Sequence, residues 1–157
     1  MKLLFVDDEQ TFLKYLAKRL VLDGYEVRTT YSGEEGVEAA AKEDFHVAIV
    51  DLKMPGIDGI EVQKRLKELQ PELPCIVLTG YGSVEHALES GKYNAFQFLS
   101  KPVDYDTLVK TINEAYEYRQ QQELAGAEDK RREGAAKQEG KMKKAFSKFK
   151  QFYGVNE

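Results

Sequence analysis

The stretch from His46 to Gly59 reads H-V-A-I-V-D-L-K-M-P-G-I-D-G, and the fold can be worked out from it. Val47 to Val50 form an unbroken apolar run rich in β-branched side chains, which is typical of a strand covered on both faces. The run ends on Asp51. Pro55-Gly56 then turns the chain, because proline cannot continue a strand ladder and glycine tolerates unusual dihedral angles. A carboxylate in this position either closes the strand as a turn former or lies where open α/β sheets bind ligands.

Strand and helix patterns alternate along the rest of the chain. The expected strands are Lys2–Val6, Tyr25–Thr30, Val47–Asp51, Pro74–Thr79 and Phe96–Ser100. The expected helices, recognised by apolar residues at helical spacing and by capping residues, are Glu9–Leu22, Ser32 to near Glu43, Gly59–Leu69, Val84 to near Ser90, and Tyr105 to near Glu123. Strict alternation with short connections predicts an α/β fold, a doubly wound five-stranded parallel sheet with helices on both faces.

Polar residues that can carry chemistry follow four of the expected strands. Asp7 and Asp8 follow the first strand, Asp51 ends the third, Thr79 ends the fourth and Lys101 follows the fifth. If the second strand is an edge of the sheet, these strand ends converge on one crevice. Three crowded carboxylates repel one another, so at least one must be neutralised by protonation, a cation or a metal. All-oxygen ligands with open positions suit Mg²⁺. An aspartate nucleophile, Mg²⁺, a lysine and a hydroxyl are the groups that phosphoryl transfer requires.

Four short motifs occupy these strand ends in order: F-V-D-D-E at 5–9, D-L-K-M-P-G-I-D-G at 51–59, L-T-G-Y-G-S at 78–83 and F-L-S-K-P at 98–102. Together they resemble the receiver domain of bacterial two-component response regulators, and the resemblance covers Lys2 to near Glu123. It implies a flavodoxin-like receiver fold with strand order 2-1-3-4-5. It also implies a phosphorylation-controlled signalling protein that acts through protein contacts, rather than an enzyme that turns over a substrate.

The resemblance implies a role for each acidic residue of the site. Asp51 would accept a phosphoryl group from a histidine kinase or a phosphotransfer protein. Asp8, Asp51 and the backbone carbonyl of Lys53 would bind Mg²⁺, and Asp7 would act mainly through water. The family's chemistry therefore makes Mg²⁺ the expected cofactor.

The resemblance also implies which residues contact the phosphoryl group and respond to it. Lys101 and the Thr79 hydroxyl would contact its oxygens, and Phe98 matches the aromatic residue that switches conformation in the family. Lys53 and Tyr81 would overhang the group and limit the access of water. Self-dephosphorylation is therefore expected to be slow.

Two other functions remain open. One is a pseudo-receiver that binds a partner without being phosphorylated, and the presence of Asp8, Asp51, Thr79 and Lys101 argues against it. The other is a Mg²⁺-dependent phosphatase that forms an aspartyl phosphate. Such enzymes usually carry a second acid two residues after the nucleophile, and this chain has Lys53 there.

The end of the chain differs from the rest in charge. The 157 residues carry a formal net charge of −4, but 1–123 sum to −8 and 124–157 to +4. We expect three segments: a receiver over 1–123, a charged linker or helical extension over 124–140, and a basic amphipathic tail over 141–157. An acidic body is a poor binder of nucleic acids.

The tail carries four apolar residues, Met142, Phe146, Phe149 and Tyr153, on one helical stripe. This stripe would pack on the chain's own receiver or a partner subunit, or lie on a membrane surface. The tail is short and shows no helix-turn-helix pattern, so we expect no DNA-binding output domain. The expected partners are a kinase or phosphotransfer protein upstream and, downstream, another protein or a second copy of the chain.

Cellular location and redox state follow from simple features of the sequence. No apolar stretch approaches the about 18 residues that suggest a transmembrane helix, and the N-terminus lacks a signal-peptide pattern. A cytoplasmic protein is therefore expected. The single cysteine, Cys75, excludes an internal disulfide and lies in an apolar run, which favours a buried, reduced thiol.

Overall fold

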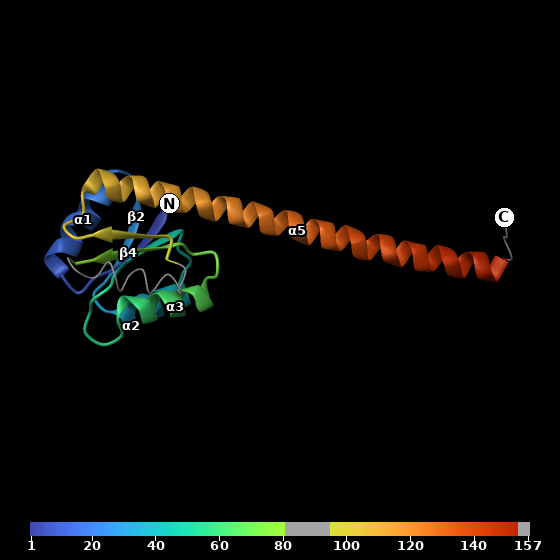
Figure 1. Ribbon diagram of the computed structural model, residues 1–157, viewed down its shortest axis with the longest axis horizontal. Helices are drawn as coiled ribbons and strands as arrows, with labels where there is room; N and C mark the ends of the chain where they lie inside the picture. Colours follow the sequence, from blue (N-terminus) through green and yellow to red (C-terminus); the bar gives the residue numbers. More distant parts are fainter. Residues whose placement is uncertain (81–94, 154–157) are drawn as a thin grey trace. The chain divides into compact units, whose positions relative to one another are not determined.

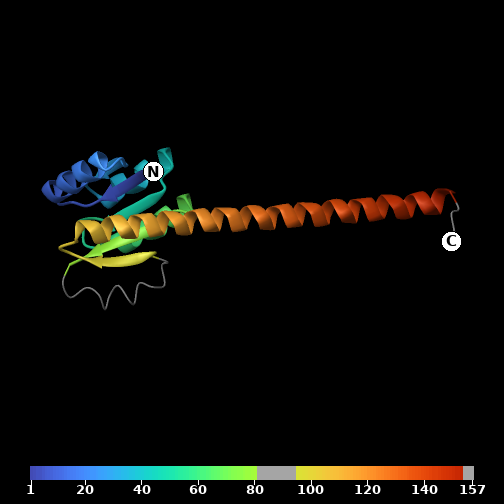
Figure 2. The ribbon, with the colours of Figure 1, turned by 90° about the horizontal axis from the view of Figure 1, so that it is seen from above.

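The computed structural model describes residues 1–80 and 95–153, and its centre is a parallel β-sheet. The strands are β1 (Lys2–Val6), β2 (Glu26–Thr30), β3 (Val47–Asp51), β4 (Cys75–Thr79) and β5 (Gln97–Ser100). They pair in the order β2-β1-β3-β4-β5, with β2 and β5 at the two edges (Figure 2). The predicted fold and strand order are confirmed. The helix expected over Val84–Ser90 lies outside the described residues.

Helices cover both faces of this sheet (Figure 1). They are α1 (Gln10–Leu22), α2 (Gly33–Lys42), α3 (Gly59–Leu69) and α5 (Tyr105–Tyr153). On one face, α1 and the first turns of α5 pack on the sheet through a buried cluster that includes Phe5, Leu13 and Ile112. On the other face, α2 and α3 lie side by side and contribute to a second cluster that includes Val50 and Leu66. Two helical layers on a parallel sheet explain why β3 and β4 are apolar up to the polar residue at their carboxyl ends.

Burial follows the position of each strand in the sheet. Every residue of β3 and β4 is buried, whereas exposed and partly buried residues alternate along most of the edge strand β2. Cys75 begins β4 and is 4% exposed. Burial raises the pKa of its thiol to about 12, as expected for a core cysteine.

Helix caps fix where α2 and α3 begin. The Ser32 hydroxyl accepts a hydrogen bond from the Glu35 amide, and the Glu35 carboxylate accepts one from the Tyr31 amide. The sequence S-G-E-E at 32–35 predicts a capping box, and the Ser32 half of it is present, while Glu35 reaches the amide of the residue before the cap. Asp58 caps α3 in the same way by accepting from the Glu61 amide. The loop that follows Asp51 therefore ends at a defined point.

The last helix is longer than its sequence pattern predicts. It continues past Glu123 to Tyr153, through residues whose side chains are almost all exposed. Each glycine in this segment weakens a helix by only about 1 kcal/mol relative to alanine, and most of its other residues are strong helix formers. A Glu139–Lys143 ion pair of 2.7 Å, one turn apart, adds to the stability of the helix. The helical extension predicted at the C-terminus is thus present.

Two compact units divide the chain, Met1–Gln120 and Gln121–Glu157, and α5 contributes to both. The first unit contains the sheet and all the strand ends described above. In the second unit three residues of the predicted stripe, Met142, Phe146 and Phe149, lie on a helix with their side chains exposed. The side chain of the fourth, Tyr153, lies outside the part that the structure describes. The finer division of the tail into 124–140 and 141–157 stays a prediction. Among the described residues, no helix combines the length and apolar composition needed to span a bilayer.

Candidate functional site

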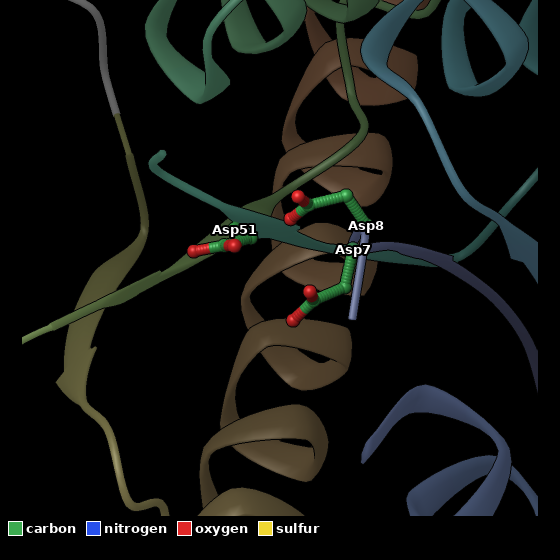
Figure 3. A group of neighbouring side chains, drawn as sticks. All are labelled: Asp7, Asp8 and Asp51. Atoms are coloured by element: carbon green, nitrogen blue, oxygen red, sulfur yellow. The ribbon is translucent and has the colours of Figure 1, made fainter. Parts of the chain in front are cut away.

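The carboxyl ends of the central strands bring three carboxylates together. Asp7 and Asp8 follow β1, and Asp51 is the last residue of β3, the neighbouring strand. One oxygen from each lies within 4.8 Å of the others, and Figure 3 shows the three side chains gathered at the strand ends. The convergence predicted from the sequence therefore occurs, because β2 takes the edge of the sheet and leaves β1 beside β3.

Asp51 is buried to an unusual degree for a carboxylate, with 5% of its surface exposed. Burial, followed by the negative charge of Asp7, raises the pKa of the Asp51 carboxyl to about 6. The Lys101 ammonium and a hydrogen bond from the Lys53 backbone oppose this rise without cancelling it. Asp51 therefore ionises near neutral pH, and a nearby cation would stabilise its charged form.

Lys101 supplies part of that positive charge. Its Nζ atom lies 2.8 Å from an oxygen of Asp7, 3.4 Å from one of Asp51 and 3.5 Å from one of Glu9. Burial alone would lower the pKa of Lys101, but its hydrogen bond to Asp7 and the surrounding carboxylates raise it above its usual value. The lysine is therefore a fixed cation beside Asp51. The peptide bond that follows it, Lys101–Pro102, is cis.

The remaining predicted site residues are placed as follows. Thr79 ends β4, is almost fully buried, and donates a hydrogen bond of 3.1 Å from its hydroxyl to the Gly80 carbonyl. Phe98 is half-buried on β5, opposite Val77. Lys53 is exposed in the turn after Asp51. Tyr81, expected to overhang the site, lies outside the described residues.

The turn that follows Asp51 is held in place by close backbone packing. The Gly59 amide donates to the Leu52 carbonyl at 2.9 Å. A Cβ atom at Gly59 would lie only 2.3 Å from the backbone oxygen of Asp51, so the helix can approach the strand end this closely only because the residue is glycine. On the other side of the turn, the Ile57 amide donates to the Glu34 carboxylate at 3.1 Å. The loop that follows Asp51 is thus held by close packing on both sides.

Sequence reasoning missed two residues of the site, Glu9 and Phe12. Glu9 faces Lys101, as given above, and the Lys101 Nζ atom also lies over the Phe12 ring, 4.7 Å from its centroid. Glu9 belongs to the acidic motif at 5–9, which is a signal that sequence reasoning could have used. For Phe12 the pattern indicated only a core position, because its spacing in α1 suits burial.

The donor set fits a hard divalent cation. Three carboxylates offer only oxygen ligands, and the exposed Asp8 leaves one side open to water, which suits Mg²⁺ since it keeps several waters when bound. Lys101 neutralises one negative charge at most, so the cluster retains an excess of negative charge for a cation to balance.

Comparison with known proteins decides the family. A sequence model of the response regulator receiver domain matches residues 3–113, the span that contains the sheet and all the strand-end residues above. The chain belongs to the response regulator receiver family.

Relatives and solved structures agree with this assignment. The receiver is 40% identical over 115 residues to the transcriptional regulatory protein GlrR of Escherichia coli K12, covering 73% of this chain and 26% of that protein. A receiver domain structure from Clostridium thermocellum matches with a TM-score of 0.72 at 35% identity, covering 76% of this chain and 96% of that one. A response regulator from Burkholderia pseudomallei was solved with a phosphorylated aspartic acid, calcium ion and citrate. It matches with a TM-score of 0.67 at 30% identity, covering 79% of this chain and 74% of that one.

One expectation about partners was wrong. The sequence analysis predicted no DNA-binding output domain, with signalling through a protein partner, a self-dimer or a membrane contact. The relatives, among them GlrR, ZraR and RegA, are regulatory proteins, GlrR and ZraR being named transcriptional regulatory proteins. The chain spans about a quarter of the length of the first of them, at 26%. The error came from judging the output by the residues that follow the receiver, although the matched receiver makes up only about a quarter of the first relatives' length.

Proposed function

We propose that this receiver is the phosphorylation-controlled input of a two-component response regulator, with Asp51 as the phosphoacceptor. The observation that carries the proposal is the position of Asp51: buried, at the end of β3, with Asp7 and Asp8 on one side and the Lys101 ammonium 3.4 Å away. The phosphorylated aspartic acid named for the Burkholderia pseudomallei relative supports the same chemistry.

The reaction assigned to Asp51 is a phosphoryl transfer from a phosphohistidine of a kinase or a phosphotransfer protein. One Asp51 carboxylate oxygen forms a bond to phosphorus, and the bond from phosphorus to the donor nitrogen breaks, leaving its electron pair on that nitrogen. Since the pKa of Asp51 is about 6, the nucleophile is largely ionised at pH 7 and above. Lys101 is positioned to stabilise the negative charge on the transferred oxygens.

Asp8, Asp51 and the Lys53 carbonyl are the residues we assign to a Mg²⁺ site, with Asp7 acting through water. Bound there, Mg²⁺ neutralises charge on the carboxylates and on the phosphoryl oxygens. The chain's own contribution is to hold these oxygens together before the donor arrives. It does so with the hydrogen bond from Lys101 to Asp7 and with the hydrogen bond of 2.9 Å that the Glu9 amide donates to Asp7.

Thr79 and Phe98 are assigned to the response that follows phosphorylation. The Thr79 hydroxyl bonds to the Gly80 carbonyl, so it must give up this bond to contact a phosphoryl oxygen. That movement frees space next to β5, into which the half-buried Phe98 ring rotates. A population shift of this kind requires contacts that differ between the two states, and the Thr79–phosphoryl hydrogen bond is one.

A labelling experiment tests the proposal. With acetyl phosphate as donor, the wild type should take up one base-labile, acid-stable phosphoryl group per chain, and only in the presence of Mg²⁺. Asp51→Asn should abolish the label. Asp58→Asn is the matched control, because Asp58 is in the same turn, is exposed, and asparagine replaces it well as a helix cap. Labelling that persists in Asp51→Asn would overturn the assignment.

The same assay separates the receiver from the phosphatase alternative. A receiver takes up one phosphoryl group per chain and releases it slowly, whereas a phosphatase turns over many different phosphoesters. Catalytic hydrolysis of an aryl phosphate by the wild type, lost in Asp51→Asn, would favour the enzyme.

A further inference from the structure

The Lys101 ammonium contacts the Phe12 ring as well as three carboxylates. The ammonium group has one short hydrogen bond, to Asp7 at 2.8 Å, and two longer ion pairs, to Asp51 and Glu9. The face of the Phe12 ring lies 4.7 Å from the same nitrogen. A cation at this distance from a ring centroid is attracted by the negative charge of the π-face.

The ring is itself held in place by the core. It lies edge-on to Phe5, with the ring centroids 6.4 Å apart and the planes at 69°, an arrangement that aromatic pairs prefer. Phe5 is fully buried on β1, two residues before Asp7. Phe12 is only partly buried, in the first turns of α1. One part of its ring packs on the core, and the ring also contacts Lys101 of the site. Its position is therefore set by the same strand that carries the acidic pair.

We propose that Phe12 is a positioning residue, whose ring keeps the Lys101 ammonium beside Asp51 in a place from which it can contact the phosphoryl group. Lys101 needs such support because its other partners are carboxylates. A divalent cation at the acidic cluster weakens the attraction between the carboxylates and the lysine ammonium, whereas it leaves the attraction between the Phe12 ring and the ammonium unchanged. This inference rests on the proposed function of Lys101 as a phosphoryl contact.

Proton NMR tests the contact without any reaction. Protons above an aromatic ring resonate upfield, so the Lys101 ε-methylene protons should be shifted upfield relative to those of the exposed Lys14. Phe12→Leu, which keeps an apolar side chain of similar size, should abolish the shift, and Phe12→Tyr should retain it. The shift should persist when Mg²⁺ is added. Normal ε-methylene shifts in the wild type would overturn the proposal.

Labelling by acetyl phosphate tests the consequence. Phe12→Leu should slow phosphorylation by about 3- to 10-fold, the effect of losing a partly desolvated cation–π contact, and Phe12→Tyr should restore the rate. The matched control is Phe96→Leu, which removes the same atoms from a partly buried ring of the same core cluster. An unchanged rate in Phe12→Leu, or an equal loss in Phe96→Leu, would show that Phe12 serves packing only and overturn the proposal.

Failure of the proposed function would look different. If the wild type takes up no phosphoryl group from any donor, the function assigned to Asp51 is wrong, whatever the NMR result. If Phe12→Leu does not fold, phenylalanines with increasing fluorination at position 12 replace it, since fluorine weakens the π-face with little change in shape. The labelling rate should then fall with each fluorine added, and a constant rate would overturn the role of the ring.

Discussion

The Lys101 ammonium donates a hydrogen bond of 2.8 Å to the carboxylate of Asp7, a residue 94 positions earlier in the chain. Asp7 is fully buried and Lys101 is 15% exposed, so water screens this contact only weakly. The pair joins the first strand of the sheet to the segment after the last. It is therefore a structural contact as well as part of the proposed phosphoryl site.

Replacing Lys101 by methionine should destabilise the receiver when no divalent cation is present. The Asp7 carboxylate would stay buried without its partner, which costs roughly 3 kcal/mol in the free energy of unfolding. Urea unfolding in a chelating buffer measures the loss, and added Mg²⁺ should reduce it by supplying another cation. Lys110→Met is the control, because that lysine makes only an exposed ion pair of 3.9 Å with Glu114. Equal losses in the two variants would contradict this account.

Asp51→Asn should stabilise the receiver in Mg²⁺-free buffer at neutral pH. The folded-state pKa of Asp51, about 6, lies above that of an unfolded aspartate, so the charged form is penalised in the folded state. The wild type therefore loses stability as the pH rises from about 4 to about 6, and the amide variant does not. A shift of about two pKa units corresponds to an advantage of about 3 kcal/mol at pH 7, which should disappear near pH 4. An advantage that is the same at both pH values would refute the burial argument.

Gly59→Ala should disturb both stability and the metal site. The added Cβ would lie 2.3 Å from the Asp51 backbone oxygen and 2.8 Å from the Leu52 Cα atom, so the turn must shift. Overpacking of this kind costs about 1–3 kcal/mol. Calorimetry should show a lower unfolding temperature and weaker Mg²⁺ binding. Gly134→Ala, with no atom within 4 Å of its added Cβ, should instead increase helicity.

Tyr105→Phe should weaken the attachment of α5 to α1. The Tyr105 hydroxyl donates a hydrogen bond of 2.6 Å to Asp23, at the end of α1, and its loss should cost about 1–2 kcal/mol. Burial, together with this hydrogen bond, raises the pKa of Tyr105 to about 12, so spectrophotometric titration should lose one late-ionising tyrosine in the variant. The control is Tyr25→Phe, because the Tyr25 hydroxyl donates only a solvent-exposed hydrogen bond of 3.2 Å, to the Asn113 side chain. A titration curve unchanged by Tyr105→Phe would contradict the prediction.

The residues that define the site were predictable because their positions follow from the strands. Asp51 and Thr79 end two apolar runs, and the carboxyl ends of parallel strands meet at one edge of a sheet. The pKa of Asp51 was not predictable in this way. It depends on how deeply the carboxylate is buried and on how close Asp7 and Lys101 lie to it, and both are properties of the packed fold.

Other features escaped the sequence for different physical reasons. The length of α5 depends on a near-balance between the helix-weakening effect of its glycines and the helix propensity of its other residues. A search for apolar residues at helical spacing measures neither of these, so it did not predict the helix beyond Glu123. The contact between Phe12 and Lys101 joins residues far apart in the chain, and no local pattern marks it. Apolar residues at helical spacing indicate which face of a helix is buried, but they do not indicate which residues that face contacts.

The burial of Cys75 also has a practical consequence. With its pKa near 12, only about one molecule in 10⁵ carries the reactive thiolate at pH 7, and the side chain lies within β4 out of reach of reagents. Oxidants and alkylating agents should therefore leave the Cys75 thiol of the folded protein unmodified. Since this is the chain's one cysteine, a cysteine introduced on the surface would be the sole reactive handle. Fluorophores or spin labels can then be attached at chosen positions without first replacing a native residue.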